Sequence, residues 1–292
     1  MFVATLVASA ALSQDNIAEA VGRLATAGCA PVDSQWLDED KAADIFFGQD
    51  PVAARAALTD VGEKVDVIVQ LAEGREKKLL IADMDSTMIT VECIDELADY
   101  AGIKPQIAEI TERAMRGELD FAGALHERVA LLKGLADGAI DQCRTERVKI
   151  MGGAKALVRT MKARGARTLL VSGGFTRFTG PVAEEIGFDA AVANVLEIAD
   201  GALLGTVTMP IVDAARKRAE LEAAIEGGID RALTLAVGDG ANDIPMIQGA
   251  ALGVAYHAKP KTREAAGAEI VHGDLSVLLY AQGIASAEWV DG

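Results

Sequence analysis

The chain has few cysteines, few basic residues and no long apolar run, and each shortage excludes a class of protein. The three cysteines among 292 residues are Cys29, Cys93 and Cys143. An odd number of widely separated cysteines predicts reduced thiols rather than a disulfide framework, and none has the spacing of a metal site. We therefore expect a cytoplasmic protein in which these cysteines bind no metal.

Basic residues are outnumbered by acidic residues, 28 to 44, which gives a net charge of −16. Neither a basic stripe nor a basic tail is present, so the composition argues against a nucleic-acid or anionic-membrane partner. The apolar run at 2–12 is shorter than the ~20 residues of a membrane-spanning helix. It imitates the core of a signal peptide, but no basic residue precedes it, since the first is Arg23. We expect this run to begin the first strand of a domain.

Residues 1–76 have the pattern of a small α+β domain. Strand patterns at 2–8, 31–37, 42–48 and 65–71 are combined with helical patterns at 15–27 and 51–62. The resulting order of strand, helix, strand, strand, helix and strand is ferredoxin-like. A polar run at 73–78 predicts a short linker to the rest of the chain.

Residues 78–292 have the alternating pattern of an α/β domain. Strand patterns lie at 79–83, 167–171, 189–193, 233–237 and 252–256, and helical patterns at 153–164, 175–186, 213–225 and 242–248. Such alternation predicts a doubly wound parallel sheet. The segment 196–204 predicts a hairpin that turns at Asp200 and Gly201. Residues of about 88–150 predict an inserted helical cap that could close over a substrate, with helices at 92–101, 104–116 and 120–133.

Two acidic residues follow the first strand of this predicted sheet. Asp83 and Asp85 lie two positions apart after the apolar run 79–82, and Thr87 follows them. Open α/β sheets bind ligands at the carboxyl ends of their strands, and a spacing of two in extended backbone points both carboxylates to the same side. One carboxylate could then attack an electrophile or bind a hard cation while the other transfers a proton. The alternative is an ordinary polar turn after a strand.

Three later segments supply further polar groups in a fixed order. The Ser-Gly-Gly segment at 172–174 joins a strand pattern to a helix pattern, where a hydroxyl and backbone N–H groups form an anion pocket. Lys217 lies in a basic stretch of the next predicted helix. The segment 238–243 again joins a strand to a helix, and Asp243 is able to cap that helix.

Together these four elements resemble the haloacid dehalogenase superfamily, most of whose members transfer phosphoryl groups through an aspartyl-phosphate. The Asp-x-Asp-x-Thr run at 83–87 carries the first motif of that superfamily. The resemblance implies a Rossmann-like core in which Asp83 is the nucleophile and Asp85 is the general acid and base. Lys217 would offset the repulsion between the attacking carboxylate and the phosphate.

The resemblance also implies that Mg²⁺ is the cofactor. Asp83, Asp239 and the backbone carbonyl of Asp85 would be its protein ligands, in keeping with its preference for hard oxygen ligands. Asp243 would orient the metal's water molecules and Lys217 from outside the ligand set. The residues implied to contact the phosphoryl group are Ser172, Gly173, Gly174, Lys217 and Asn242.

A longer match narrows the resemblance to the phosphoserine phosphatase family. The string at 83–92 and the cap segment at 115–128 both match that family. The match implies that Glu92 contacts the substrate's amino group and that Arg128 contacts its carboxylate. L-phosphoserine carries an ammonium, a carboxylate and a phosphate, so it requires an acid, a forked base and a metal–lysine site.

Each of these cap residues also has a purely structural interpretation. The family implies that Met115 and Phe121 line the substrate pocket, but both could be ordinary core residues of the cap. Arg128 could pair with Glu127 or Asp120 at the surface, and the glutamate could be a solvated residue in the first turn of a helix. The spacing of all four, taken together, favours the functional interpretation.

The resemblance therefore predicts a cytoplasmic, Mg²⁺-dependent enzyme that hydrolyses L-phosphoserine to L-serine and phosphate, the last step of serine biosynthesis. Two alternatives remain: a transferase that passes the phosphoryl group to homoserine, and a serine sensor with a silent phosphatase domain. Residues 1–76 resemble the ACT-like regulatory domain that precedes some bacterial members, which suggests serine binding and a homodimer through that domain. The complete catalytic set argues against a silent domain.

Overall fold

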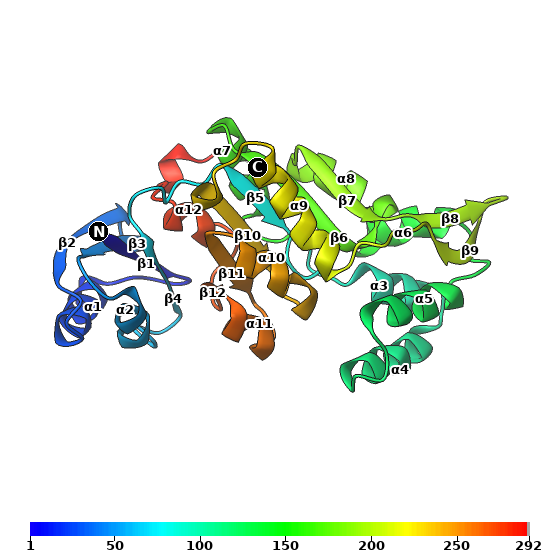
Figure 1. Ribbon diagram of the computed structural model, residues 1–292, viewed down its shortest axis with the longest axis horizontal. Helices are drawn as coiled ribbons and strands as arrows, with labels where there is room; N and C mark the ends of the chain where they lie inside the picture. Colours follow the sequence, from blue (N-terminus) through cyan, green and yellow to red (C-terminus); the bar gives the residue numbers. More distant parts are fainter. Residues whose placement is uncertain (291–292) are drawn as a thin grey trace.

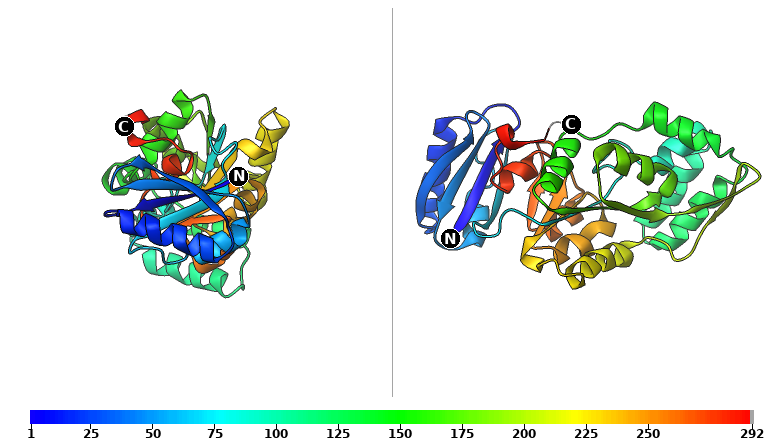
Figure 2. Two further views of the ribbon diagram at one scale, coloured as in Figure 1. Left: turned by 90° about the vertical axis from the view of Figure 1, so that its left-hand side faces the viewer. Right: turned by 90° about the horizontal axis from the view of Figure 1, so that it is seen from above.

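The chain forms an N-terminal unit, an α/β core and a helical cap, which follow one another along the long axis of the molecule (Figure 1). The structure is a computed structural model, and it describes residues 1–290. Seen from above, the N-terminal unit and the cap lie at opposite ends of the core (Figure 2). No helix within the described range has the length and apolar character that a membrane crossing requires.

The N-terminal unit has the ferredoxin-like order that the sequence predicts. Its elements are β1 (Phe2–Ala8), α1 (Gln14–Thr26), β2 (Pro31–Asp38), β3 (Ala42–Phe47), α2 (Pro51–Ala57) and β4 (Val65–Leu71). The strands form an antiparallel sheet in the order β2-β3-β1-β4. Helix α2 ends five residues before the predicted position 62. Asp60 and Gly62 have positive φ values of 57° and 77°, which an α-helix does not accommodate.

Both faces of this small sheet are covered. Leu6 of β1 packs with Leu24 of α1 in one hydrophobic cluster. Val7 of β1 and Ile68 of β4 instead belong to the main cluster of the α/β core. Alternate residues of a strand point to opposite faces, so the N-terminal helices cover one face and the core covers the other.

The core contains the predicted doubly wound parallel sheet. Its strands are β5 (Leu79–Ala82), β6 (Arg167–Phe175), β7 (Ala190–Asn194), β10 (Thr234–Gly238), β11 (Leu252–Tyr256) and β12 (Ala268–Ile270). They are all parallel, in the order β12-β11-β10-β5-β6-β7. The sequence did not predict β12, because a three-residue edge strand carries too short a pattern.

Helices cover both faces of this sheet. Leu79 and Ile81 of β5 pack on one face with α9 (Ala214–Glu226) and α10 (Ile244–Gly249). Leu80 and Ala82 pack on the other face with α7 (Ala154–Ala163), α8 (Thr176–Ile186) and α12 (Val277–Ala281). The remaining elements of the core are α11 (Pro260–Ala265) and the 3₁₀ turns η1 (Arg231–Leu233), η2 (Ala241–Asp243) and η3 (Ser286–Glu288).

The cap comprises the segment inserted between β5 and α7. Its helices are α3 (Cys93–Tyr100), α4 (Lys104–Met115), α5 (Phe121–Leu131) and α6 (Gly138–Arg147), of which α6 was not predicted individually. The predicted hairpin is present as β8 (Leu196–Ala199) and β9 (Ala202–Val207). Leu203 exchanges backbone hydrogen bonds with Gly134 and Leu135, so the hairpin is attached to the cap loop that follows α5.

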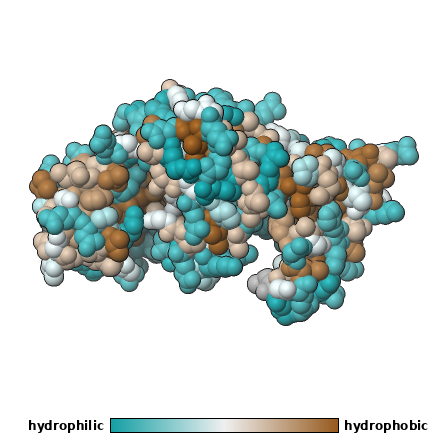
Figure 3. All heavy atoms as spheres, viewed as in Figure 1, coloured by the Kyte–Doolittle hydropathy of each residue, from teal (hydrophilic) through white to brown (hydrophobic). Residues whose placement is uncertain are grey.

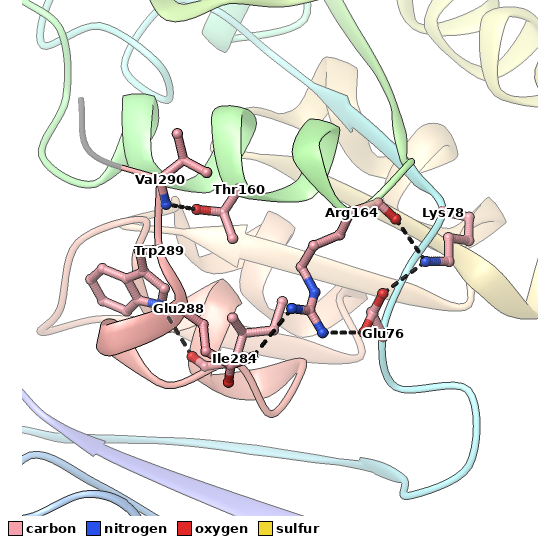
Figure 4. Close-up of polar contacts among 8 residues, drawn as sticks. All are labelled: Glu76, Lys78, Thr160, Arg164, Ile284, Glu288, Trp289 and Val290. Carbon is pink, nitrogen blue, oxygen red and sulfur yellow. Dashed lines mark hydrogen bonds and ion pairs between the residues drawn. The ribbon is translucent and has the colours of Figure 1, made fainter.

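The polar linker after β4 is held in place by the core. Arg164, the residue that caps the end of α7, donates to Glu76 at 2.8 Å, and its carbonyl accepts from Lys78 at 3.0 Å (Figure 4). The C-terminal segment lies against the same helix, where the Val290 N–H donates to the Thr160 hydroxyl at 2.8 Å (Figure 4). The linker is therefore short and well anchored.

Candidate active site

The carboxyl end of β5 places Asp83 and Asp85 between β6 and β10. The Asp83 N–H donates to the Val237 carbonyl at 3.0 Å, so strand pairing continues one residue beyond β5. The chain then turns at Ser86, which has a positive φ of 54°. Both carboxylates are buried, with Asp83 5% and Asp85 9% exposed. Buried carboxylates require hydrogen bonds or opposite charges, and Asp83 Oδ1 accepts from the N–H of the next residue, Met84, at 2.8 Å.

Lys217 supplies the positive charge nearest to Asp83. Its Nζ lies 2.6 Å from Asp83 Oδ1 and 2.7 Å from Asp243 Oδ1. The side chain is fully buried on the first turns of α9, whose N-terminus is capped by Asp213. Burial alone would lower the pKa of Lys217, but the carboxylates of Asp243 and Asp83 outweigh burial and raise the pKa above its usual value. Lys217 is therefore a fixed ammonium group that faces the predicted nucleophile.

Asp83, Asp239 and Asp243 form an acidic cluster at this edge of the sheet. One carboxylate oxygen of each lies within 4.8 Å of the others. Burial and repulsion from Asp243 raise the pKa of Asp83 well above its usual range, although Lys217 opposes the shift. Burial, with repulsion from Asp243 and Glu92, likewise raises the pKa of Asp239 to about 7. Three carboxylates beside one lysine leave excess negative charge, so the cluster fits a divalent cation that prefers oxygen ligands.

The two aspartates that follow β10 have different partners. Asp243 Oδ2 accepts from the Gly240 N–H at 2.9 Å, so both of its oxygens have protein donors. Among the described residues, the Asp239 carboxylate accepts only a long contact from the Thr87 hydroxyl, at 3.5 Å. This difference favours Asp239 as the metal ligand and Asp243 as the residue that holds Lys217. Asn242 is half-buried on the adjacent turn η2.

The predicted anion-binding turn lies against Asp85. The pairing of β6 with β7 is irregular between Val171 and Phe175, where Ser172, Gly173 and Gly174 of β6 have no partner in the register with β7. The Gly174 N–H donates to the buried Ser172 Oγ at 2.9 Å. A Cβ at position 174 would lie 3.1 Å from both Asp85 Oδ2 and Ser172 Oγ. The absence of a side chain at Gly174 thus allows the turn to approach the carboxylate closely.

Asp85 has the properties of a proton-transferring group. Its Oδ1 is buried and has no hydrogen-bond partner among the described residues. Burial, together with repulsion from Glu92, raises the pKa of Asp85 to about 7. A carboxyl group with a free oxygen and a pKa near neutrality can both donate and accept a proton.

Glu92 and Arg128 approach the acidic pair from the cap. Glu92 is exposed at the start of α3, does not cap that helix, and accepts from the Ser86 hydroxyl at 2.8 Å. Arg128 is half-buried on α5. Burial lowers the pKa of Arg128, whereas the charges of Asp95, Glu92 and Asp85 favour its protonated form. The guanidinium group of Arg128 is therefore close enough to these three acidic residues to interact with them electrostatically.

The alternative partners of Arg128 are engaged elsewhere. Glu127 pairs with Arg113 at 2.6 Å, and Asp120 caps α5 by accepting from the Gly123 N–H at 2.7 Å. Within the part of the chain that the structure describes, Arg128 has no ion pair, and its Nε donates to the Ala124 carbonyl at 3.2 Å. The interpretation of Arg128 as a surface ion-pair partner of Glu127 or Asp120 is therefore wrong.

Phe121 brings the cap into contact with the predicted anion-binding turn. A Cβ built on Gly173 would lie 3.0 Å from Phe121 Cζ, so the ring packs directly on the backbone of that glycine. Figure 3 shows the surface indented between the core and the α4 end of the cap. Met115 is the last residue of α4. The prediction for its side chain lies outside the described residues.

Sequence reasoning missed one buried polar residue beside the site. Asn194 ends β7, is 2% exposed, and is hydrogen-bonded to both Gly173 and Val212. Its sequence signal was an amide directly after the predicted strand at 189–193. That signal alone does not distinguish a buried bridging residue from an ordinary polar residue at the end of a strand.

The family of the chain follows from a direct comparison. Residues 80–248, more than half of the chain, match the family model described as haloacid dehalogenase-like hydrolase. The chain belongs to this hydrolase family. Phosphatases of the family use a divalent metal, in agreement with the acidic cluster of Asp83, Asp239 and Asp243.

Similar hydrolases include proteins named phosphoserine phosphatase. One from Streptomyces coelicolor is 44% identical over 242 residues, which cover 82% of this chain and 59% of that relative. One from Polaromonas sp. is 48% identical over 208 residues, which cover 69% of this chain and 88% of that relative. The chain thus spans about three fifths of the length of the Streptomyces relative. A solved HAD-family hydrolase from Salmonella enterica serovar Typhi has a TM-score of 0.84 and 28% identity, covering 96% of this chain and 98% of that one.

Proposed function

We propose that this hydrolase converts L-phosphoserine to L-serine and phosphate in a Mg²⁺-dependent reaction. The observation that carries the proposal is the buried Asp83–Lys217 ion pair beside a free oxygen of Asp85. Glu92 and Arg128, on the cap side of the same site, provide one negative and one positive group for the two charges of an amino acid. The Streptomyces and Polaromonas relatives are phosphoserine phosphatases by name, which supports the choice of substrate.

In the first step Asp83 attacks phosphorus, and the bond between phosphorus and the serine oxygen breaks. Lys217 offsets the repulsion between the carboxylate and the phosphate, while the Ser172 hydroxyl, which accepts from the Gly174 N–H, donates its proton to a phosphoryl oxygen. Asp85 gives its proton to the departing alkoxide. This proton transfer contributes about 10²–10⁴-fold in rate for a poor leaving group.

In the second step water attacks the aspartyl-phosphate on Asp83. Asp85, now ionised, accepts a proton from that water as the new bond to phosphorus forms. The bond between Asp83 and phosphorus breaks, which releases inorganic phosphate and restores the carboxylate. Asp85 is protonated again and ready to serve the next substrate, so the two steps are balanced in protons.

Mg²⁺ would be held by Asp83, Asp239 and the backbone carbonyl of Asp85, and when bound it supplies positive charge to the phosphate oxygens. Asp243 keeps Lys217 directed at Asp83 through the 2.7 Å contact. We also propose that Asn242 contacts the phosphoryl group and that Met115 and Phe121 line the substrate pocket.

A panel of phosphomonoesters tests the proposed function. Phosphate release is measured from L- and D-phosphoserine, phosphothreonine, ethanolamine phosphate and a sugar phosphate, each with Mg²⁺ and with EDTA. Asp83→Asn serves as the blank, and Asp15→Asn, an exposed change on α1, is the matched control. We expect Mg²⁺-dependent preference for L-phosphoserine that Asp83→Asn abolishes. Equal activity on all substrates of the panel would contradict L-phosphoserine as the preferred substrate. Activity in Asp83→Asn would contradict Asp83 as the nucleophile.

Product analysis separates hydrolysis from transfer. With homoserine present, a hydrolase releases inorganic phosphate in equal amount to serine, whereas a transferase accumulates phosphohomoserine. A serine sensor with a silent catalytic domain would release no phosphate from any substrate of the panel.

We further propose that residues 1–76 form an ACT-like domain and that 78–292 form the phosphatase domain, with the cap at about 88–150. We propose a cytoplasmic enzyme that forms a homodimer through the first domain. Light scattering should then give about twice the chain mass of 30.4 kDa. Serine inhibition that does not compete with phosphoserine would support a regulatory site, whereas purely competitive inhibition would indicate product binding alone.

A further inference from the structure

One buried amide connects two segments of the active site. The Asn194 Nδ2 donates to the Gly173 carbonyl at 2.7 Å, and the Val212 N–H donates to Asn194 Oδ1, also at 2.7 Å. A backbone carbonyl only accepts and a backbone N–H only donates, so these two contacts fix the orientation of the amide. The side chain is 2% exposed, so little water is available to replace either bond.

The first contact sets the geometry of the anion-binding turn. In a trans peptide the carbonyl of Gly173 and the N–H of Gly174 point in opposite directions within one plane. Holding the carbonyl therefore directs this N–H, which donates to Ser172 Oγ at 2.9 Å. The contact lies where the ladder between β6 and β7 is interrupted, just before pairing resumes at Phe175 and Asn194. The amide thus supplies a bond that the strand ladder lacks.

The second contact sets the start of the helix that carries Lys217. Val212 is buried and immediately precedes Asp213, the N-cap of α9. The Asp213 side chain accepts from the Arg216 N–H at 2.8 Å, and its carbonyl accepts from the Lys217 N–H at 3.0 Å. A displacement of Val212 would therefore move the first turn of α9 and the lysine with it.

We propose that Asn194 is a positioning residue that fixes the 172–174 turn and Lys217 relative to each other, so that hydroxyl and ammonium bind the same phosphoryl group. The inference rests on the proposed function. Only an amide of this length offers a donor to Gly173 and an acceptor to Val212. Asn194→Asp keeps the acceptor but places an oxygen against the Gly173 carbonyl, and Asn194→Leu removes both bonds at similar volume.

The test compares these two variants with a matched control. Thr168→Val acts on the same strand pair at its other end, where the buried Thr168 is hydrogen-bonded to Asp189 at 3.0 Å, away from the site. For the full chain with Mg²⁺, the measured quantities are kcat, KM, the inhibition constants of inorganic phosphate and of serine, and the unfolding midpoint. Direct titration with inorganic phosphate gives its affinity independently of turnover.

We expect Asn194→Leu to weaken phosphate binding and to lower kcat by about 10- to 100-fold, because the Ser172 hydroxyl and the Lys217 ammonium are no longer held in fixed positions relative to each other. Serine inhibition should change by less than about twofold, since Glu92 and Arg128 lie on the cap. Asn194→Asp should show the same selective pattern to a smaller degree. Thr168→Val should lose stability while keeping both inhibition constants.

Three results would overturn the inference: unchanged phosphate affinity in both variants, equal weakening of phosphate and serine, or the same kinetic loss in Thr168→Val. If Asn194→Leu does not fold, Asn194→Asp decides by the same criteria. A wild-type chain without phosphatase activity would instead refute the proposed function, and the phosphate titration would still decide whether Asn194 organises an anion site.

Discussion

Replacing Asp66 with alanine is expected to loosen the junction between the N-terminal unit and the core. Asp66 lies on β4, is 4% exposed, and accepts from the backbone N–H groups of Val271, His272 and Gly273 at 2.8, 3.1 and 2.6 Å. Hydrogen bonds to a charged group contribute about 1.5–3 kcal/mol each, but such terms are not additive and water would reach some of the freed donors. We expect a loss of about 3–5 kcal/mol in the free energy of unfolding.

Urea unfolding of the full chain at pH 7 measures this loss. The two tryptophans report on the two sides of the junction, since Trp36 lies on β2 and Trp289 lies in the C-terminal segment. Asp33→Ala is the matched control, because Asp33 is exposed on the same sheet and, among the described residues, its carboxylate accepts only from the N–H of its neighbour Ser34. A change below about 1 kcal/mol in Asp66→Ala, or an equal change in the control, would refute the reasoning.

Three further predictions concern the site and the linker. Arg128→Ala should reduce turnover of phosphoserine by about 10- to 100-fold and spare p-nitrophenyl phosphate, which has no carboxylate. Equal loss on both substrates, or a similar loss in the control Arg113→Ala, whose arginine pairs with Glu127, would mean that Arg128 only supports the cap. Gly174→Ala should lower kcat, because its Cβ would lie 3.1 Å from Asp85 Oδ2 and Ser172 Oγ, whereas a Cβ at Gly180 meets open space and Gly180→Ala should keep full activity. Normal turnover in Gly174→Ala would contradict the close approach. Hydrogen bonds from Arg164 and Lys78 hold the pKa of Glu76 below its usual value. Glu76→Gln should therefore cost under about 1 kcal/mol above pH ~4.5, and this cost should disappear as the pH falls through the folded pKa; a difference in unfolding midpoint that grew as the pH was lowered would refute this sign.

Local patterns in the sequence were sufficient to predict most of the elements. β4 and β11 occupy the predicted ranges 65–71 and 252–256, because half-buried and fully buried strands carry a clear apolar pattern. The 172–174 segment follows a strand pattern for the same reason, although β6 itself continues to Phe175. The sequence did not predict β12 or α12, since three and five residues are too few to establish a period.

The sequence by itself determined the order of the chemical groups. The aspartates after β5, the Ser-Gly-Gly segment of β6, the lysine of α9 and the aspartates after β10 each follow from strand and helix patterns within about ten residues. Parallel strands carry their C-terminal residues to one edge, so the meeting of these groups could be expected without knowing any distance.

Only the tertiary structure decided which group contacts which. The pairing of Lys217 with both Asp83 and Asp243, the bridge that Asn194 forms from Gly173 to Val212, and the clamp of Asp66 on 271–273 join residues that are distant in sequence. Such contacts depend on strand order and on the packing of helices against the sheet, which no local period encodes. The physical reason is that a period specifies which face of an element is buried, whereas the buried partner on that face is chosen by the fold as a whole.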